Sequence, residues 1–332
     1  MRGDDVADRS PASSPPRLIF LGGLGRSGST IAGQLLGEFP GACNVGEVVH
    51  LWQRGIMGSQ RCGCGEPFPE CPFWNEVGHA AFGGWRNVDV TEVSALRARI
   101  DRMRFIPVLA MPRLSAAHRR VLDEYLSYYL HVYSAIAEVS GCEAIVDSSK
   151  NGSLAFCLRW RTDLDFRVIH LVRDPRAVAY SWARQVARPD MNSPAALGDR
   201  RMWTYSASAA AMQWNVQNGA MHLLARSGTP RLLVRYEDFA SAPETVLAQI
   251  ASFATLPGEV ITEFLGTDEA GHWADVSVSH TVSGNPARFS SGRIPIRPDE
   301  QWRSAMPAAQ RRIVTALTFP LLTHYGYARR AR

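Results

Sequence analysis

The stretch RLIFLGGLGRSGST, residues 17–30, decides the fold class that we expect for this chain. Residues 18–21 form a short apolar run bounded by glycines, which is typical of a buried strand in a parallel sheet. The following residues, 29–39, carry apolar side chains at helical spacing. This part of the chain is therefore predicted to form a strand, a glycine-rich turn and a helix.

The same alternation continues through the rest of the sequence. Strands are predicted over 143–147, 167–172 and 231–236, and helices over 91–104, 115–140, 151–161, from 173 onward, 201–226, 243–255 and 307–324. Strands that alternate with helices indicate a P-loop-like, three-layer α/β/α fold with a central parallel sheet. We expect a single domain over residues 17–328.

Three segments depart from this alternation. Residues 1–16 end in SPASSPP and are predicted to be a disordered tail. Residues 55–85 are rich in Gly, Pro, Cys and Trp, and are predicted to be an irregular insertion. Residues 271–298 are polar and rich in Gly and Pro, and they are too long for a simple connector, which favours a closing loop over a bound ligand.

Composition and charge exclude several classes of protein. The chain has 332 residues, of which 46% are hydrophobic and 20% charged, so a disordered chain, a coiled coil and a collagen-like fibre are excluded. No window approaches 18 consecutive apolar residues, and the first residues lack the pattern of a signal peptide, so we expect a cytoplasmic protein without a membrane span. The net charge is +5 and the arginines are scattered, which favours a small anionic ligand over nucleic acid.

The glycine-rich turn has the frame of a phosphate-binding loop. Gly23 and Gly28 are spaced as in G-x-x-x-x-G, which lets backbone N–H groups converge on an anion at a helix N-terminus. Ser29 follows Gly28 directly, so the lysine that an ATP-binding loop carries at this point is missing. The basic residue of the turn is Arg26, inside the loop. A kinase-type site for ATP and Mg²⁺ is therefore disfavoured.

Two motifs together resemble a known family. GRSGST, residues 25–30, and VIHLVRDPRAVAYS, residues 168–181, resemble the phosphosulfate loop and the strand–Arg–helix unit of sulfotransferases that use 3′-phosphoadenosine 5′-phosphosulfate (PAPS). The resemblance covers residues 17–325 and is strongest to bacterial enzymes and to the branch that includes the tyrosylprotein sulfotransferases. It implies PAPS as co-substrate, adenosine 3′,5′-bisphosphate as product, no required metal, and a hydroxyl acceptor that is a small molecule, a glycan or a lipid.

The resemblance also implies the residues that bind the nucleotide. The 5′-phosphosulfate is assigned to the glycine-rich turn, and the 3′-phosphate to an Arg at a strand end, where a guanidinium can grip phosphate with two N–H groups. Tyr236 matches a family tyrosine near the adenine. The candidates are Arg26, Ser27, Gly28, Ser29 and Thr30 in the turn, Arg173 and Ser181 for the 3′-phosphate, and Ser279, Arg288, Arg293 and Arg297 in the closing loop.

Three residues are the catalytic candidates beside Arg26. Glu47 lies where the family branch has its catalytic base, and His50, three residues later, is the rival base. Lys150 is the single lysine among 36 basic residues, and the strand before it would deliver it to the carboxyl edge of the sheet. The resemblance implies that Lys150 and Arg26 act on the sulfuryl group. Asp147 is expected to orient Lys150 or to cap the next helix, with Ser148 and Ser149 as equally plausible caps.

The insertion contains three closely spaced cysteines, Cys62, Cys64 and Cys71, followed by His79. Zinc sites usually show paired C-x₂₋₄-C spacings, and C-x-C followed by one cysteine fits that pattern poorly. We therefore expect no metal site, and favour buried thiols over an oxidisable pair and over zinc. The surrounding aromatic residues either pack the insertion or form the wall of an acceptor pocket, with packing favoured.

Two other functions compete with sulfuryl transfer. A P-loop-type kinase would need Mg²⁺ and ATP, and would not depend on Arg173. A non-catalytic nucleotide-binding or polyanion-binding protein would tolerate the loss of Glu47 and Lys150. The oligomeric state and the identity of the acceptor are not readable from the residues.

Overall fold

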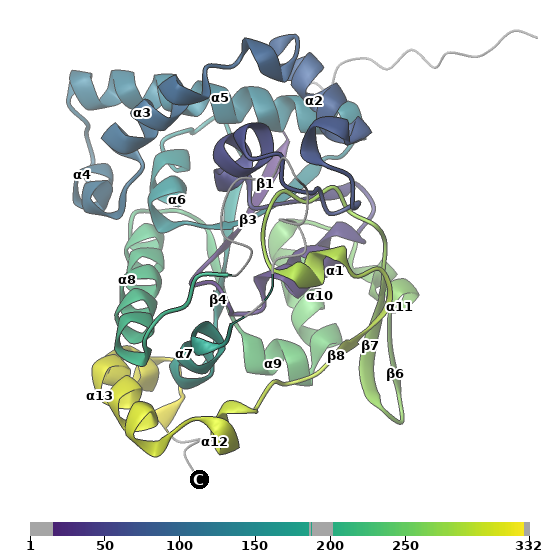
Figure 1. The fold of residues 1–332 in the computed structure, drawn as a ribbon, viewed down its shortest axis with the longest axis vertical. Helices are drawn as coiled ribbons and strands as arrows, with labels where there is room; N and C mark the ends of the chain where they lie inside the picture. The colour runs from purple at the N-terminus through teal and green to yellow at the C-terminus, as the bar shows by residue number, and fades with distance from the viewer. Residues whose placement is uncertain (1–15, 186, 188–201, 329–332) are drawn as a thin grey trace, which may run out of the picture.

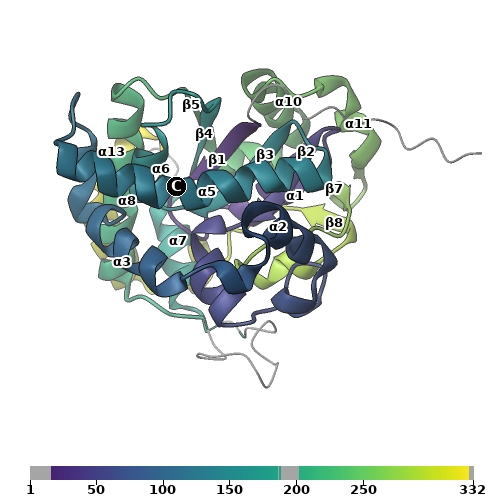
Figure 2. The same cartoon turned by 90° about the horizontal axis from the view of Figure 1, so that it is seen from above.

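The computed structural model describes residues 16–185, 187 and 202–328. Its centre is a parallel sheet with the strand order β2-β3-β1-β4-β5, and Figure 2 shows these strands side by side across the molecule. The strands are β1 (Arg17–Gly22), β2 (Ala42–Gly46), β3 (Ala144–Lys150), β4 (Phe166–Val172) and β5 (Arg231–Arg235). The predicted α/β fold with a central parallel sheet in a single domain is confirmed. Strand β2 was not predicted, because its sequence ACNVG has no apolar run.

Helices cover both faces of this sheet, as the continuous burial of β1 requires. Leu18 and Phe20 point to one face and pack with α5 (Ala116–Ser140), α6 (Gly152–Leu158) and α8 (Ala207–Arg226). Ile19 and Leu21 point to the other face and pack with α1 (Ser29–Gly37) and α10 (Pro243–Ala254). Figure 2 shows α5 running across one face and α10 on the opposite one. Burial on both faces explains why β1 is apolar without alternation.

The segment predicted to be irregular, 55–85, is mostly helical, so that prediction is wrong. It contains the end of a π-helical segment η2 (Leu51–Met57), short 3₁₀ turns η3 (Phe68–Glu70) and η4 (Trp85–Asn87), and the helix α2 (Pro72–Phe82). Pro72 stands in the first turn of α2, where its missing N–H costs nothing. Trp52, Phe68 and Trp74 are buried together, so the aromatic residues of this region pack its core.

The helix expected over 91–104 is interrupted. Helix α3 covers Val90–Ile100, and after a bend the chain continues in a 3₁₀ turn, η5 (Met103–Phe105), and a single turn, α4 (Ile106–Leu109). Asp101, at the end of α3, turns into the core and accepts hydrogen bonds from Tyr125 and Ser153. This buried polar contact ends the helix where helical spacing alone predicts that it continues.

The closing-loop segment, 271–298, contains two strands, which the sequence analysis did not predict. β7 (Gly271–Val276) pairs antiparallel with β6 (Leu265–Asp268) and with β8 (Gly292–Ile296), and only 277–291 is a loop with one 3₁₀ turn, η8 (Pro286–Phe289). These strands carry polar residues on their outer face, so their sequences lack the apolar run by which the other strands were predicted. Before them lie η7 (Gly258–Val260) and α11 (Ile261–Phe264). Figure 1 shows 277–291 looping back toward β1 and β3.

The remaining helices gather at the end of the molecule where the strands stop. They are α7 (Pro175–Ala183), α9 (Tyr236–Ser241), α12 (Trp302–Ala305) and α13 (Ala308–His324). Among the described residues, no helix is long and apolar enough to cross a lipid bilayer. The expected tail falls outside the described residues, apart from residue 16.

Candidate functional site

The carboxyl ends of the parallel strands bring the main candidate residues to one edge of the sheet. The glycine-rich turn follows β1, Glu47 follows β2, Lys150 ends β3, Arg173 follows β4 and Tyr236 follows β5. Parallel strands in an open α/β sheet present their ligand-binding crevice at this edge. The order of the strands in the sheet thus brings together residues that are about 200 positions apart in the sequence.

The turn has the backbone that an anion-binding loop needs. Gly28 adopts φ +88, a left-handed conformation, and its backbone begins α1 without a side-chain cap. A Cβ at Gly28 would lie 2.6 Å from the Tyr236 ring, so only glycine fits between the turn and that ring. The first N–H groups of α1 therefore remain available as donors, together with the partial positive charge of a helix N-terminus. Ser27 and Ser29 are buried beside them.

Glu47, Lys150 and His50 form a compact charged cluster. Lys150 Nζ lies 2.5 Å from Glu47 Oε1 and also donates to the Ser148 carbonyl at 2.9 Å. His50 Nε2 lies 3.4 Å from the other oxygen, Glu47 Oε2. The two predicted bases and the single lysine therefore meet around the Glu47 carboxylate. Only 9% of the surface of the Glu47 residue is exposed.

The protonation states in this cluster favour Glu47 over His50 as the charged base. Burial acts to raise the pKa of Glu47, but the charge and hydrogen bond of Lys150 act against it, so the pKa lies below its usual value and the side chain is a carboxylate at neutral pH. Burial, together with the nearby Arg54, lowers the pKa of His50 to about 3. The imidazole is therefore neutral.

The backbone around Glu47 is held by contacts from two other segments. Its N–H donates to the Val282 carbonyl at 2.8 Å, and Val282 N–H donates back to Val45 at 2.9 Å. From β3, Ser149 Oγ accepts the N–H of Val49 at 2.9 Å. Glu47 is thus fixed by the segment 277–291 on one side and by the sheet on the other.

Asp147 holds Ser149 in place, which differs from the role predicted for it. Its carboxylate accepts from Tyr133 Oη at 2.7 Å and from the backbone N–H and hydroxyl of Ser149 at 2.7 and 2.5 Å. Burial raises the pKa of Asp147 to about 6. The cap of helix α6 is Asn151, so the prediction that Asp147, Ser148 or Ser149 caps this helix is wrong.

Arg173 is buried at the end of β4 between the turn and the C-terminal part of the chain. Its guanidinium donates to the Arg26 carbonyl at 3.1 Å and to Asp299 at 3.0 Å, and it lies 4.4 Å from the centre of the Tyr236 ring. Arg173 Nε has no hydrogen-bond partner among the described residues. Asp299 was missed by the sequence analysis, since nothing in its local pattern points to a site. Ser181 lies half-buried on α7.

Arg26 points from the turn toward Trp182 of α7. Its guanidinium lies 5.2 Å from the Trp182 ring, and Nη2 contacts Met202 Sδ at 3.2 Å. Burial lowers the pKa of Arg26, and Glu47 is the nearest charge that acts in the opposite direction. Arg26 itself has φ +75, another left-handed position in this short turn.

The four closing-loop candidates are dispersed by the structure. Arg297 is exposed beside Tyr236, whose hydroxyl donates to the Arg297 carbonyl at 3.1 Å. Arg288 is buried and donates to the carbonyls of Thr281 and Arg61. Arg293 pairs with Asp268 on the antiparallel sheet, and Ser279 lines a hollow at the far end of α1. Of the four, Arg297 contacts Tyr236, through its backbone carbonyl.

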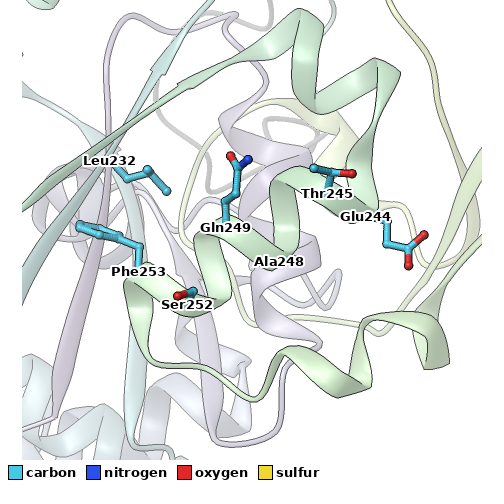
Figure 3. Close-up of a pocket in the computed structure, with 7 residues that line it drawn as sticks. All are labelled: Leu232, Glu244, Thr245, Ala248, Gln249, Ser252 and Phe253. Atoms are coloured by element: carbon cyan, nitrogen blue, oxygen red, sulfur yellow. The ribbon is translucent and has the colours of Figure 1, made fainter.

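A separate hollow lies away from this edge, on the surface of α10. Figure 3 shows its lining residues, of which Leu232 belongs to β5 and the others, from Glu244 to Phe253, belong to α10. The lining offers one carboxylate and no basic side chain, which does not suit an anionic ligand. We therefore assign the candidate site to the strand ends and not to this hollow.

Comparison with known proteins shows the family of this chain. A model of the sulfotransferase family matches residues 16–259, which is more than half of the chain. The chain is also similar to carbohydrate sulfotransferase 3 of Mus musculus, with 27% identity over 172 residues, or 49% of this chain and 34% of that protein. The match therefore spans about a third of the length of this curated relative.

Two solved structures are similar in fold at low identity. The sulfotransferase domain of the Synechococcus PCC 7002 olefin synthase gives a TM-score of 0.47 with 21% identity, covering 94% of this chain and 96% of that one. Sulfotransferase STF9 from Mycobacterium avium gives a TM-score of 0.43 with 13% identity, covering 95% of this chain and 78% of that one. At these values the likenesses say nothing about the acceptor.

Proposed function

From the premise that the chain belongs to the sulfotransferase family, whose donor is PAPS, we propose that the strand ends form its catalytic site, with Glu47 as the base. The observation that carries this proposal is the ion pair of 2.5 Å between Lys150 and Glu47, next to a glycine turn with an uncapped helix N-terminus. We further propose residues 17–328 as the catalytic domain. Because we assign the role of catalytic base to Glu47, we also propose that the chain is related to the branch that includes the tyrosylprotein sulfotransferases.

The residues at this edge suit a nucleotide with phosphates at both ends of its ribose. The turn with Arg26, Ser27, Gly28, Ser29 and Thr30 would hold the 5′-phosphosulfate through backbone N–H groups and hydroxyls. Arg173, whose buried Nε lacks a partner, would hold the 3′-phosphate together with Ser181 and the exposed Arg297. Tyr236, packed on the turn, would lie against the adenine. For Arg288 and Arg293 the observed contacts support structural roles instead. The Ser279 hydroxyl has no hydrogen-bond partner among the described residues, and it lines the hollow at the far end of α1.

The proposed reaction requires the protein to remove one proton from the acceptor and to neutralise the negative charge on the leaving oxygen. When bound, PAPS supplies the sulfuryl group, and adenosine 3′,5′-bisphosphate leaves as the sulfur–oxygen bond to its 5′-phosphate breaks. Glu47 accepts the proton of the acceptor hydroxyl, whose oxygen bonds to sulfur. Lys150 and Arg26 place positive charge where negative charge develops on the leaving oxygen.

The ion pair also suggests how the base is activated. In the structure Lys150 is bonded to Glu47, which keeps the carboxylate weakly basic. A polyanion at the turn competes for the Lys150 ammonium, so the pKa of Glu47 rises as its partner turns away. Glu47 thereby becomes a stronger base only when the donor site is filled.

The acceptor is proposed as a hydroxyl of a small molecule, a glycan or a lipid. The name of the mouse relative, a carbohydrate sulfotransferase, supports testing glycans first. A panel of glycans, phenols and hydroxylated lipids, with release of adenosine 3′,5′-bisphosphate as the readout, would identify the class.

The proposed donor site is tested by calorimetric titration without Mg²⁺. We expect adenosine 3′,5′-bisphosphate to bind tightly, and 5′-AMP to bind at least about tenfold more weakly, because the buried Arg173 would lose its phosphate. Arg173→Ala should remove this difference, whereas Arg120→Ala, on the exposed start of α5, should keep it. Equal or tighter binding of ATP with Mg²⁺ would refute the proposal and favour a kinase. Binding without turnover of any acceptor, unchanged by Glu47→Gln, would favour a non-catalytic nucleotide-binding protein.

A further inference from the structure

Four soft or borderline metal-ligating side chains converge at the boundary between the insertion and the segment 277–291. Cys62, Cys64 and Cys71 come from the insertion, and His280 comes from a segment more than 200 residues later. Their sulfur atoms and ring nitrogen all lie within 4.8 Å of one another. His79, which follows the cysteines in the sequence, is not part of this cluster.

The distances fit four ligands around one ion. Cys71 Sγ lies 3.6 Å from Cys62 Sγ and 3.8 Å from Cys64 Sγ, and His280 Nδ1 lies 3.2 Å from Cys71 and 3.8 Å from Cys62. Zinc binds thiolate sulfur at about 2.3 Å, so a regular tetrahedron separates two sulfur ligands by about 3.8 Å and a sulfur from a nitrogen ligand by slightly less. A disulfide would use two of these groups at an S–S distance of about 2.05 Å and would leave the third thiol and the imidazole unused.

We propose that Cys62, Cys64, Cys71 and His280 bind one structural zinc ion. Thiolate and imidazole ligands in a tetrahedral arrangement are the combination that zinc prefers. Binding releases the thiol protons that remain on the cysteines, and the imidazole ligates as the neutral ring through Nδ1. Four protein ligands leave no open position on the metal, so the ion holds the fold and takes no part in sulfuryl transfer.

The surroundings of the cluster keep the ligands in place. The ring of Phe73 stacks on His280 with centroids 5.0 Å apart, and Trp74 Nε1 donates to the His280 carbonyl at 2.9 Å. Gly63, between two of the cysteines, donates to the Thr281 carbonyl at 3.0 Å. A Cβ at Gly63 would come within 2.4 Å of both Thr281 and Ser279, so this close approach requires glycine. Contacts that orient the ligands are a regular part of metal sites.

The proposed ion would also fix the backbone that positions Glu47. His280 is two residues before Val282, whose carbonyl accepts the Glu47 N–H at 2.8 Å. Arg54 donates to Ser283 Oγ at 2.7 Å on the other side of this contact. Loss of the metal should therefore loosen the segment that carries Val282, and Glu47 with it.

The test begins with the metal content of the full chain, purified without a polyhistidine tag from zinc-supplemented medium. Mass spectrometry of the metals should find about one zinc per chain, and less than about a tenth of that in the double variant Cys64→Ser/His280→Ala. Cys142→Ser is the matched control, because Cys142 is a free thiol that lies outside the cluster. Its zinc content should equal that of the wild-type protein.

A second measurement on the wild-type chain covers the case in which the double variant does not fold. Zinc is removed with a chelator under reducing conditions, and Co²⁺ is titrated in while the absorption spectrum is followed. A thiolate-to-cobalt charge-transfer band that saturates near one equivalent, and is displaced by Zn²⁺, supports the site. These readouts do not depend on sulfotransferase activity.

Three results would overturn the proposal. They are a zinc-free chain that shows no thiolate band with Co²⁺, an intact mass two hydrogens lower that reveals a disulfide within the cluster, and full zinc content in the folded double variant. Iron in place of zinc would overturn the identity of the metal.

Discussion

Lys150 combines two demands in one residue. Its backbone has φ +62, the left-handed region that most side chains avoid, and its ammonium lies 2.5 Å from Glu47. In the proposed mechanism the ammonium stands between the carboxylate and the leaving oxygen, and a guanidinium, which is larger and planar, would not fit this place. The only lysine of the chain therefore stands where arginine would not serve.

We expect Lys150→Arg and Lys150→Asn both to lower kcat by at least about 100-fold, the usual cost of removing a charge that stabilises a transition state. Asparagine tolerates the left-handed backbone, so Lys150→Asn separates the loss of charge from backbone strain. The measurement is release of adenosine 3′,5′-bisphosphate under single-turnover conditions. If Lys150→Arg keeps a third of the wild-type rate, the specific role of the ammonium is wrong.

Glu47 and His50 are distinguished by their ionisation. Glu47→Gln should lower kcat by about 10²- to 10⁴-fold. His50→Gln should lower it less than about tenfold, because a pKa of about 3 makes His50 a weak proton acceptor. In the free enzyme, kcat/KM should show no titration near pH 6.5, where an unperturbed histidine would appear. A limb near pH 6.5 that disappears in His50→Gln would instead make His50 the base.

Helix α1 and the turn before it depend on one glycine. Gly28→Ala would place a methyl group 2.6 Å from the Tyr236 ring on a backbone with φ +88. Either the turn or Tyr236 must shift, so adenosine 3′,5′-bisphosphate should bind at least about tenfold more weakly, measured by calorimetry.

The matched control for this substitution is Gly219→Ala in α8. A Cβ there meets no atom within 4 Å, so alanine should leave nucleotide binding unchanged. It should raise the unfolding free energy by about 0.5–1 kcal/mol through its higher helix propensity. If both variants bind the nucleotide equally, the assignment of the donor to this turn is wrong.

The elements explain which parts of the fold the sequence could predict. Strand β1 contains a continuous apolar run and β4 is mostly apolar, and α5 keeps helical spacing over 25 residues, so both types of element were found. β2, β7 and β8 were missed because their side chains alternate or are small, and their pairing comes from distant partners. Helix α2 was missed because the cysteines, glycines and prolines of the surrounding segment outweighed the helical spacing of its buried residues, Trp74, Val77 and Gly78.

The molecule as a whole carries three histidines whose burial opposes protonation. Burial lowers the pKa of His170 to about 3 and of His222 to about 4, and His50 also lies near 3. Below about pH 6.5 the unfolded chain binds these protons and the folded chain does not, so stability falls as the pH falls toward 4. Burial also raises the pKa of two carboxyl groups, Asp147 to about 6 and Asp101, and these act in the opposite direction. The lowered pKa values of Glu47, Asp163 and Asp165 act in the same direction as the histidines.

We therefore expect a lower Tm at pH 5 than at pH 7, measured by differential scanning fluorimetry. His170→Gln keeps a polar partner for Asn218, which bonds to the ring at 2.8 Å, but removes the group that titrates. Its Tm should be lower than wild type at pH 7 and should fall less between pH 7 and pH 5. An identical decrease in both proteins would show that His170 does not contribute.

The sequence by itself determined the fold class, the glycine-rich turn between the first strand and the first helix, and the choice of Glu47, Lys150 and Arg173 as site candidates. Those features depend on short-range patterns: an apolar strand, a glycine turn and a basic residue at a strand end. Only the tertiary structure decided that Lys150 pairs with Glu47, that Asp299 meets Arg173, and that His280 completes the cysteine cluster. These contacts join residues more than 100 positions apart, and no local pattern encodes which strand ends and loops the fold will bring together.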